Sequence, residues 1–353
     1  MKSRIGVGLI GFGTVGTGVA KVLIENADVI RRRVGVPVEL LRIADLDIIR
    51  DRGVAVPPGV LTTDVKQVLA DPAIDIVIEL VGGYDFAKRV ILEAIAAGKH
   101  VVTANKALLA LHGEEIFAAA EARHVDLGFE ASVGGGIPVI RALTEGLAAN
   151  RIESIYGIIN GTSNYILSRM TRDGHSFEAV LKDAQQAGYA EADPTFDIEG
   201  VDAAHKATIM SAIAFGIPVQ FDKAHVEGIT NLQASDIRYA EKLGYRIKLL
   251  GITKRVANGI ELRVHPTLIP ANRLIANVEG AMNAVVVQGD AVGATLYYGK
   301  GAGAEPTASA VIADLVDITR LATADPEHRV PYLAFQPNEM SDTPILPMSE
   351  ITT

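Results

Sequence analysis

A glycine-rich loop between a short apolar run and an amphipathic segment is the feature that most constrains this fold. The run Ile5–Ile10 precedes the loop, and Thr14–Glu25 follows it with apolar residues at helical spacing. Between them stands Gly11-Phe12-Gly13-Thr14-Val15-Gly16. This G-x-G-x-x-G spacing binds dinucleotides when it joins a strand to a helix, because its glycines allow a tight turn, close approach of a pyrophosphate and close helix packing. The alternative, a turn that binds nothing, is disfavoured by the flanking strand and helix.

Short apolar runs and helical patterns alternate through the first third of the chain. Strands are predicted at 38–43, 75–80, 100–103 and 125–129, with helices at 87–97 and 114–122 and a longer helix and connection over 26–37. Strands that alternate with helices indicate a parallel sheet covered on both faces. We therefore expect an α/β fold whose residues 1–132 form a Rossmann-type dinucleotide-binding domain.

The pattern changes at a glycine run, SVGGGIP, which predicts a hinge loop and a new helix beginning near Ile137. Beyond it we predict helices at 163–172, 177–186 and 201–215, and strands at 152–159, 259–265, 284–288 and 295–298. The mixture indicates a second α+β domain, over 133–304.

A second glycine-rich turn, GKGAGAEP, leads into a helix predicted at 307–321. Its apolar pattern suits packing against the first domain, so we expect 305–330 to return there. Residues 331–353 are rich in Pro, Ser and Thr and are predicted to be a tail or linker.

Composition excludes several classes of protein. The net charge of −9 disfavours a nucleic-acid partner, and no apolar run is long enough to span a membrane. No export signal follows the N-terminus, so a cytoplasmic protein is expected. The chain has no cysteine, which excludes disulfides, thiolate metal sites and aldehyde oxidation through a thiohemiacetal. Redox chemistry would need hydride transfer with oxygen and nitrogen acid–base groups.

Asp45 follows the second predicted strand, where an acidic residue bonds the ribose hydroxyls of a dinucleotide. A carboxylate would repel a 2′-phosphate, which favours NAD over NADP. Arg42 and Arg50 lie nearby and keep NADP possible. The alternative for Asp45 is a surface turn.

Asn105 and Lys106 come directly after the strand at 100–103. Ligands of open α/β sheets bind at the carboxyl ends of the strands, so Lys106 could meet a carbonyl oxygen or a carboxylate there. The alternative is a solvated lysine at a helix start, where the helix dipole disfavours a cation.

An acidic segment before a helix carries the most specific chemistry. Asp202 and Lys206 stand four residues apart on one helical face and are expected to pair. A lysine with a suitable pKa can protonate the oxygen formed when an aldehyde is reduced. Further carboxylates would suit a substrate with an ammonium group; they are Glu191, Asp193, Asp197 and Glu199. The alternative is a surface ion pair among solvated acids.

At these residues the chain resembles the homoserine dehydrogenase family. The similarity runs without a gap from Ala184 through AGYAEADPTFDIEGVDAAHK to Lys206. GFGTVG, TANK, GIINGTSNY and GKGAG are also similar to the family and occur in the same order. The resemblance covers about residues 5–321. Two alternative hypotheses are another NAD-dependent amino-acid or hydroxy-acid dehydrogenase, and a nucleotide-sensing regulator.

The resemblance implies interconversion of L-aspartate 4-semialdehyde and L-homoserine with NAD(P)H. It implies that Lys206 donates the proton, with Asp202 and Lys106 in the same catalytic site. Substrate binding is implied for Glu191, Asp202, Gly188 and Asp197. Besides the nucleotide loop and Asp45, cofactor contacts are implied for Lys106, Gly188 and Gly303. A monovalent cation such as sodium is implied at Glu130, Val133, Gly135 and Ile137, and a homodimer through the second domain.

The sequence departs from the family pattern at two places. Many members have an arginine before the acidic residue that follows the second strand, where this chain has Ala44, which supports NAD. Many bacterial members also continue into a C-terminal regulatory domain. ILPMSEITT resembles the approach to that domain, so either a short form or a shortened piece of a longer chain is expected.

Overall fold

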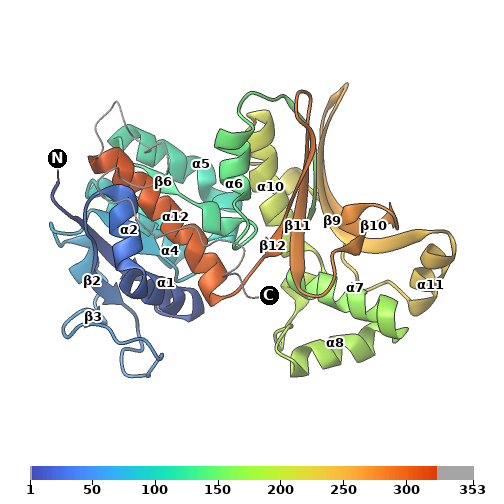
Figure 1. Ribbon diagram of the computed structural model, residues 1–353, viewed down its shortest axis with the longest axis horizontal. Coiled ribbons are helices and arrows are strands. Elements are labelled where there is room, and N and C mark those ends of the chain that lie inside the picture. The colour runs from blue at the N-terminus through green and yellow to red at the C-terminus, as the bar shows by residue number, and fades with distance from the viewer. Residues whose placement is uncertain (1, 324–353) are drawn as a thin grey trace, which may run out of the picture.

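A computed structural model describes residues 2–323 as two sheets with helices around and between them (Figure 1). The first sheet is parallel, with strand order β3-β2-β1-β4-β5-β6. Its central strand carries the nucleotide loop at its carboxyl end, as the glycine motif predicts. The strands are β1 (Ile5–Ile10), β2 (Val38–Ala44), β3 (Leu61–Thr62), β4 (Ile76–Glu79), β5 (His100–Thr103) and β6 (Leu127–Gly128).

Helices cover both faces of the first sheet, which explains why its strands are apolar without alternation. In β4, Ile76 and Ile78 pack into one apolar cluster and Val77 into another on the opposite face. Helices α1, α2 and α12 contribute to the first cluster, and α3, α4 and α5 to the second. Their bounds are α1 (Thr14–Glu25), α2 (Ala27–Val34), α3 (Lys66–Leu69), α4 (Asp85–Ala96), α5 (Lys106–Arg123) and α12 (Ala304–Thr323).

The described part of the segment that follows the second domain packs against the first domain. Helix α12 packs along α1, and at Gly18 a Cβ would stand only 2.6 Å from the Ala304 carbonyl oxygen. An ion pair of 3.1 Å joins Lys21 to Glu305 at the same contact. The predicted segment 324–330 and the tail at 331–353 lie outside the described residues.

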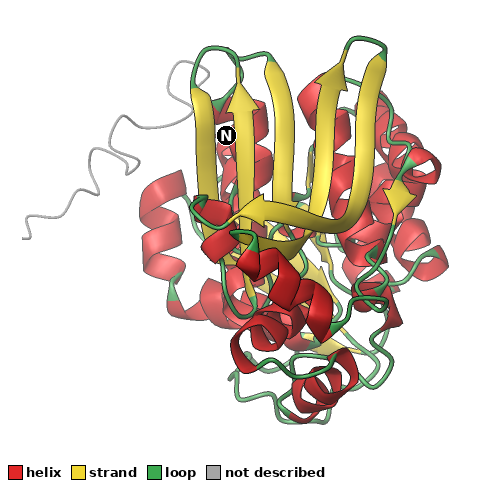
Figure 2. Cartoon of the chain, turned by 90° about the vertical axis from the view of Figure 1, so that its right-hand side faces the viewer, coloured by secondary structure: helices red, strands yellow, loops and turns green. Residues whose placement is uncertain are grey.

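The second sheet has the order β12-β11-β7-β9-β10-β8 and is antiparallel except where β8 joins β10 (Figure 2). Helix α10 lies between this sheet and α5 of the first domain (Figure 1). The Rossmann-type fold with a second α+β domain is thus confirmed. The strands are β7 (Ile152–Ile158), β8 (His225–Val226), β9 (Tyr245–Val256), β10 (Gly259–Pro270), β11 (Met282–Gly289) and β12 (Gly293–Lys300).

One face of the second sheet packs on the helices that carry the acidic segment. A single apolar cluster combines strand residues such as Ile155 and Val264 with residues of these helices. Within the described chain no helix is both long and apolar enough to cross a bilayer. The helices of this domain are α6 (Val139–Arg141), α7 (Gly161–Asp173), α8 (Phe177–Gln186), α9 (Thr195–Ile198), α10 (Val201–Phe215) and α11 (Ala234–Lys242).

Several predicted elements differ from the structure. Strand β9 and helix α11 were not predicted, and β10 extends beyond the predicted 259–265. Strand β9 is buried on both faces and contains buried Lys248, so it lacks the alternation that marks a strand. The expected longer helix over 26–37 is instead a separate helix, α2, after a break at Asn26. Helix α5 begins at Lys106, well before the predicted 114.

Candidate active site

The nucleotide loop has the close approaches that its glycines predict. At Gly11, with φ of +98°, a Cβ would lie 2.7 Å from the backbone of Leu80. At Gly16 it would lie 2.1 Å from the Gly11 carbonyl oxygen, so α1 packs directly on the turn. At Gly13 a Cβ would meet nothing within 4 Å, which leaves the backbone open to a ligand at the start of α1.

Two adjoining hollows follow the carboxyl edge of the first sheet. The first, of about 420 Å³, lies over the nucleotide loop. The second, of about 240 Å³, shares Leu80 with the first and contains Lys106. It is closed on one side by Phe196 of α9, so the second domain contributes to it. The two hollows meet at Leu80, next to the nucleotide loop, so together they could hold a dinucleotide. The first hollow is lined by Ile10, Gly11, Gly13, Ala44, Asp45, Leu46, Thr63, Val65, Leu80, Val81 and Phe86.

Asp45 lies at the end of β2, as predicted, and is tied to the loop. Its Oδ2 accepts a hydrogen bond of 2.5 Å from the Phe12 N–H, and its Oδ1 accepts one of 2.8 Å from the Asp47 N–H. These bonds fix the carboxylate at the rim of the first hollow.

The arginine at this rim is one that the sequence analysis missed. Arg52 donates to Asp45 Oδ1 at 3.4 Å, and its guanidinium lies 4.8 Å from the centre of the Phe12 ring. Arg42 instead bonds the Gly59 carbonyl oxygen, and Arg50 is exposed. The loop after Asp47 folds back, so a residue seven positions beyond Asp45 becomes its neighbour.

Two lysines, one from each domain, share the Asp202 carboxylate. Lys206 donates to Asp202 Oδ2 at 2.6 Å and to the Ile159 carbonyl oxygen at 2.8 Å. The Lys106 ammonium lies 3.1 Å from Asp202 Oδ1. Asp202 stands in the first turn of α10, where the helix dipole favours an anion. The solvated surface pair considered for this helix is wrong, because Asp202 and Lys206 are both buried.

Burial and charge set the protonation of this pair. Burial alone would raise the pKa of Asp202, but the ammonium groups of Lys206 and Lys106 lower that pKa below its ordinary value. Burial lowers the pKa of Lys206, although Asp202 opposes this shift, and Lys106 lowers it further. The result is a stable carboxylate beside an ammonium that releases its proton more readily than a surface lysine.

Asn160 holds the carboxylates in place and was not singled out from the sequence. Its Oδ1 accepts the Ser163 N–H and caps α7. Its Nδ2 donates to Asp202 Oδ2 at 2.9 Å and to Asp197 Oδ1 at 2.7 Å. Asp197 Oδ2 also accepts from Thr162 Oγ1 at 3.0 Å. The predicted substrate ligand Asp197 is therefore part of the frame around Asp202, and the signal for Asn160 is its position as a helix cap within GIINGTSNY.

Other predicted substrate and cofactor residues lie on exposed backbone. Gly188, with φ of +77°, and exposed Glu191 belong to the loop between α8 and α9. Across residues 2–323 no hydrogen bond or ion pair joins the Glu191 carboxylate to Asp202, Lys106 or Lys206. Gly303, with φ of +126°, immediately precedes α12.

The hinge residues are buried, and backbone N–H groups bind the carboxylate of one of them. The Glu130 carboxylate accepts the N–H groups of Ile140 at 2.9 Å and Arg141 at 2.8 Å. Burial raises the pKa of Glu130 to about 7, even though these bonds oppose the shift. Gly135 has φ of +55°, and Val133 and Ile137 are buried beside it. No cluster of three or more His, Cys, Asp or Glu side chains with metal-binding geometry occurs in the described part, so a cation here would depend on carbonyl oxygens.

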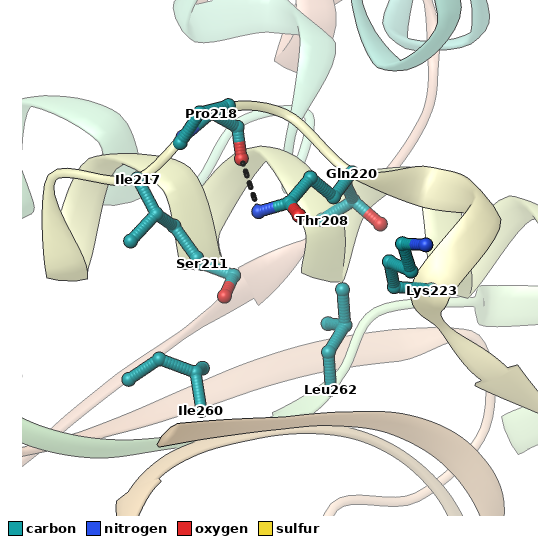
Figure 3. A pocket seen from close by; sticks show the side chains of 8 residues that line it. All are labelled: Thr208, Ser211, Ile217, Pro218, Gln220, Lys223, Ile260 and Leu262. Carbon is teal, nitrogen blue, oxygen red and sulfur yellow. Dashed lines mark hydrogen bonds between the residues drawn. The ribbon is translucent and has the colours of Figure 1, made fainter. Parts of the chain in front are cut away.

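A third hollow, of about 320 Å³, lies near the C-terminal end of α10 and contains none of these residues (Figure 3). Its hydroxyl groups are already bonded: Ser211 pairs with Thr253 at 2.8 Å, and Thr208 donates to the Ala204 carbonyl oxygen. Gln220 bonds Pro218 across its rim (Figure 3). The reactive groups thus gather at the other hollows.

Comparison with known proteins identifies the family. The model of the homoserine dehydrogenase NAD binding domain matches residues 11–130, and that of homoserine dehydrogenase matches 138–316. The chain belongs to the homoserine dehydrogenase family. Homoserine dehydrogenase of Pseudomonas aeruginosa is 59% identical over 97% of this chain and 78% of its own length. That of Neisseria gonorrhoeae is 58% identical over 99% and 80%.

A solved homoserine dehydrogenase from Thiobacillus denitrificans is 64% identical, with a TM-score of 0.89, over 99% of this chain and 80% of its own. Homoserine dehydrogenase activity and a nicotinamide cofactor, both predicted from the sequence, are confirmed by this membership. A chain of this family is an oxidoreductase, so the nucleotide-sensing alternative is wrong.

His205 is a buried histidine that precedes Lys206 in helix α10. Its ring lies 5.4 Å from that of Phe196 and 4.3 Å from that of Phe221. Within residues 2–323 its Nδ1 has no hydrogen-bond partner. Burial lowers the pKa of His205 to about 4 from an ordinary value of 6.5, so the imidazole is neutral at pH 7.

We predict that His205 makes the free energy of unfolding depend on pH between 6.5 and 4. A depressed pKa contributes stability that is present above pH 6.5 and is lost as pH falls toward 4. As pH falls over this range, the free energy of unfolding of the unchanged protein should decrease by up to about 3 kcal/mol more than that of H205F. Denaturant unfolding at several pH values measures this free energy. H175Q, which replaces an exposed histidine, is the control. Parallel pH curves for H205F and the unchanged protein would refute the assignment.

Proposed function

We propose that the chain reversibly reduces L-aspartate 4-semialdehyde to L-homoserine with NAD(P)H, and that Lys206 donates the proton to the alcohol oxygen. The supporting observation is the buried Lys206 ammonium, held by Asp202, whose other oxygen binds Lys106 of the second hollow. The reaction would serve threonine and methionine biosynthesis in the cytoplasm. We further propose residues 1–132 and 133–304 as the two domains.

Lys206 has one N–H left for a substrate. An ammonium group has three donors, and two of these bond Asp202 Oδ2 and the Ile159 carbonyl oxygen. The third can bond the carbonyl oxygen that becomes the alcohol. Because burial lowers the Lys206 pKa, transfer of its proton to a nascent alkoxide is favoured, while Asp202 keeps the amine in place.

Lys106 and the carboxylates would bind the rest of the substrate. Lys106 lines the second hollow and can bond a substrate oxygen there. We propose that Asp202, Asp197 and Glu191 surround the ammonium group of homoserine. Gly188 has no side chain, so the substrate can reach the backbone there. Glu191 would join them through its exposed loop.

The dinucleotide would be held by Gly11, Phe12, Gly13, Thr14, Val15 and Gly16, with Asp45 at the ribose and Lys106, Gly188 and Gly303 near the nicotinamide. When bound, the nicotinamide ring supplies or accepts the hydride. The N–H groups at the start of α1 would bind the pyrophosphate.

Replacing the proton donor should abolish turnover. We expect K206A to lose nearly all homoserine oxidation, about 100-fold or more, because general acid catalysis contributes this much. Reduced cofactor should still bind, which its fluorescence measures independently of activity. K223A, at an exposed lysine of the third hollow, is the control.

Retention of more than a few per cent of the rate by K206A would contradict its assignment. Oxidation of malate or lactate in preference to homoserine would favour the alternative hydroxy-acid dehydrogenase.

Asp45 should set the choice of cofactor. We expect a higher kcat/KM with NAD than with NADP, because the carboxylate repels a 2′-phosphate. D45N should move the NAD-to-NADP ratio toward NADP, since Arg52 remains at the rim. D51N, in the same exposed loop, should leave the ratio unchanged. A clear NADP preference of the unchanged protein would show that Arg52 outweighs Asp45.

We propose a monovalent cation such as sodium at the hinge, bound mainly through carbonyl oxygens of Glu130, Val133, Gly135 and Ile137. The left-handed turn at Gly135 and the buried setting of these residues support this proposal. An unchanged melting temperature when sodium is replaced by a bulky organic cation would count against it.

We propose a homodimer formed through the second domain. On strand β12, Leu296 and Tyr298 are exposed on the same face, next to a small apolar cluster that includes Ile158 and Leu250. Burial of such a surface is the usual basis of a stable dimer. Sedimentation at the mass of one chain would exclude it.

A further inference from the structure

Glu79 is a fully buried carboxylate at the carboxyl end of β4, in the wall of the second hollow. The sequence motifs predicted no role for this residue. In the described chain no Lys, Arg or His forms an ion pair with it, and burial raises its pKa. A buried carboxylate without a cation is costly unless hydrogen bonds satisfy its oxygens.

One oxygen of Glu79 holds the loop that follows β4. Oε1 accepts the Val81 N–H at 2.8 Å and the Gly82 N–H at 3.1 Å. Gly82 and Gly83 both have positive φ, +74° and +73°, so the chain turns sharply at this point. The carboxylate supplies the acceptors that this turn needs.

The other oxygen links Glu79 to the neighbouring strand. Oε2 accepts from Thr103 Oγ1 at 2.7 Å, and the two residues are cross-strand partners in β4 and β5. Thr103 Oγ1 in turn accepts the Asn105 N–H at 3.0 Å. The Thr103 hydroxyl is thus oriented, with its hydrogen toward Glu79 and its lone pair toward Asn105.

Asn105 closes the network and begins α5. Its Nδ2 donates to the Gly83 carbonyl oxygen at 2.8 Å, and its Oδ1 accepts the Leu108 N–H and caps the helix. Lys106 is the next residue, and its ammonium reaches Asp202 of the second domain. A closed ring of hydrogen bonds therefore joins the turn after β4 to the start of the helix that carries Lys106.

We propose that Glu79 is a positioning residue that locks these two loops together and so sets Lys106 against Asp202 and the bound nicotinamide. The proposal rests on the proposed placement of the nicotinamide in the second hollow. The ring has three donors directed at Glu79, from Val81, Gly82 and Thr103, and only a carboxylate accepts all of them. An amide has one accepting oxygen, so its N–H groups would face either the Val81 and Gly82 N–H groups or Thr103 Oγ1, and Thr103 could then no longer donate to residue 79.

Thr103 allows the link to be cut with little change of shape. T103V removes the hydroxyl and keeps the β-branched side chain, whereas T103S keeps the hydroxyl. T62V is the matched control, because Thr62 also ends a parallel strand and its Oγ1 accepts the Asp64 N–H at 3.1 Å. E79Q is the second variant and serves also if T103V does not fold.

We expect T103V and E79Q to lower kcat for homoserine oxidation roughly 10–100-fold, as a small misplacement of a reacting group does. T103S and T62V should stay within about threefold of the unchanged protein. ADP-ribose, which lacks the nicotinamide, should bind all variants alike, since the described hydrogen bonds of Glu79 and Thr103 include none to the Gly11–Gly16 loop. Binding of the reduced dinucleotide should weaken relative to ADP-ribose only in T103V and E79Q.

An unchanged kcat in both T103V and E79Q would overturn the proposal. An equal loss of kcat in T62V would do the same. So would a parallel loss of ADP-ribose binding, which would indicate general disruption. Failure of the proposed function gives a different result, because the unchanged protein would then not oxidise homoserine. The contrast between dinucleotide and ADP-ribose binding would still report on Glu79.

Discussion

The structure depends most on one carboxylate shared by two ammonium groups. Asp202 binds Lys206 from its own helix and Lys106 from the other domain. Each lysine lowers the pKa of Asp202, and burial lowers that of Lys206. Without the carboxylate the lysines would repel each other in a buried setting. Asp202 lies at the start of α10, where the helix dipole further stabilises its negative charge.

The packing of the two domains places this shared carboxylate. Helix α10 packs against α5 of the first domain and against the second sheet, so Asp202 lies at the domain boundary. The chain crosses this boundary at the hinge and again before α12, whose packing on α1 fastens the second crossing. Both domains must therefore be folded and docked before the two lysines meet.

The active-site loops are held by side chains that contact no proposed substrate. Asn160 bridges Asp197 and Asp202 while it caps α7. Glu79 plays a similar part at the carboxyl edge of the first sheet, where it accepts hydrogen bonds from the loop after β4 and from the end of β5. In both places a helix N-terminus is fixed by the same network that orients a charged group. Local backbone capping and the chemistry of the site are thus combined in a few buried polar residues.

Much of the first domain could be predicted from sequence, because its signals are local. The glycine spacing gave the strand, turn and helix, and four-residue spacing predicted the pairing of Asp202 with Lys206. Strand β9 could not be predicted, since burial on both faces removes its alternation. The roles of Arg52, Asn160 and Glu79 were also missed, because each depends on partners from another segment.

The sequence by itself determined the family, the nicotinamide chemistry and the pairing of Lys206 with Asp202, since short motifs encode these. Only the tertiary structure decided that Lys106 reaches the same carboxylate from the other domain, because the two residues are far apart in the chain. It also decided which groups are buried, and burial is what shifts the pKa of Lys206. Pairing across domains and loss of water are properties of packing, which no local pattern of residues specifies.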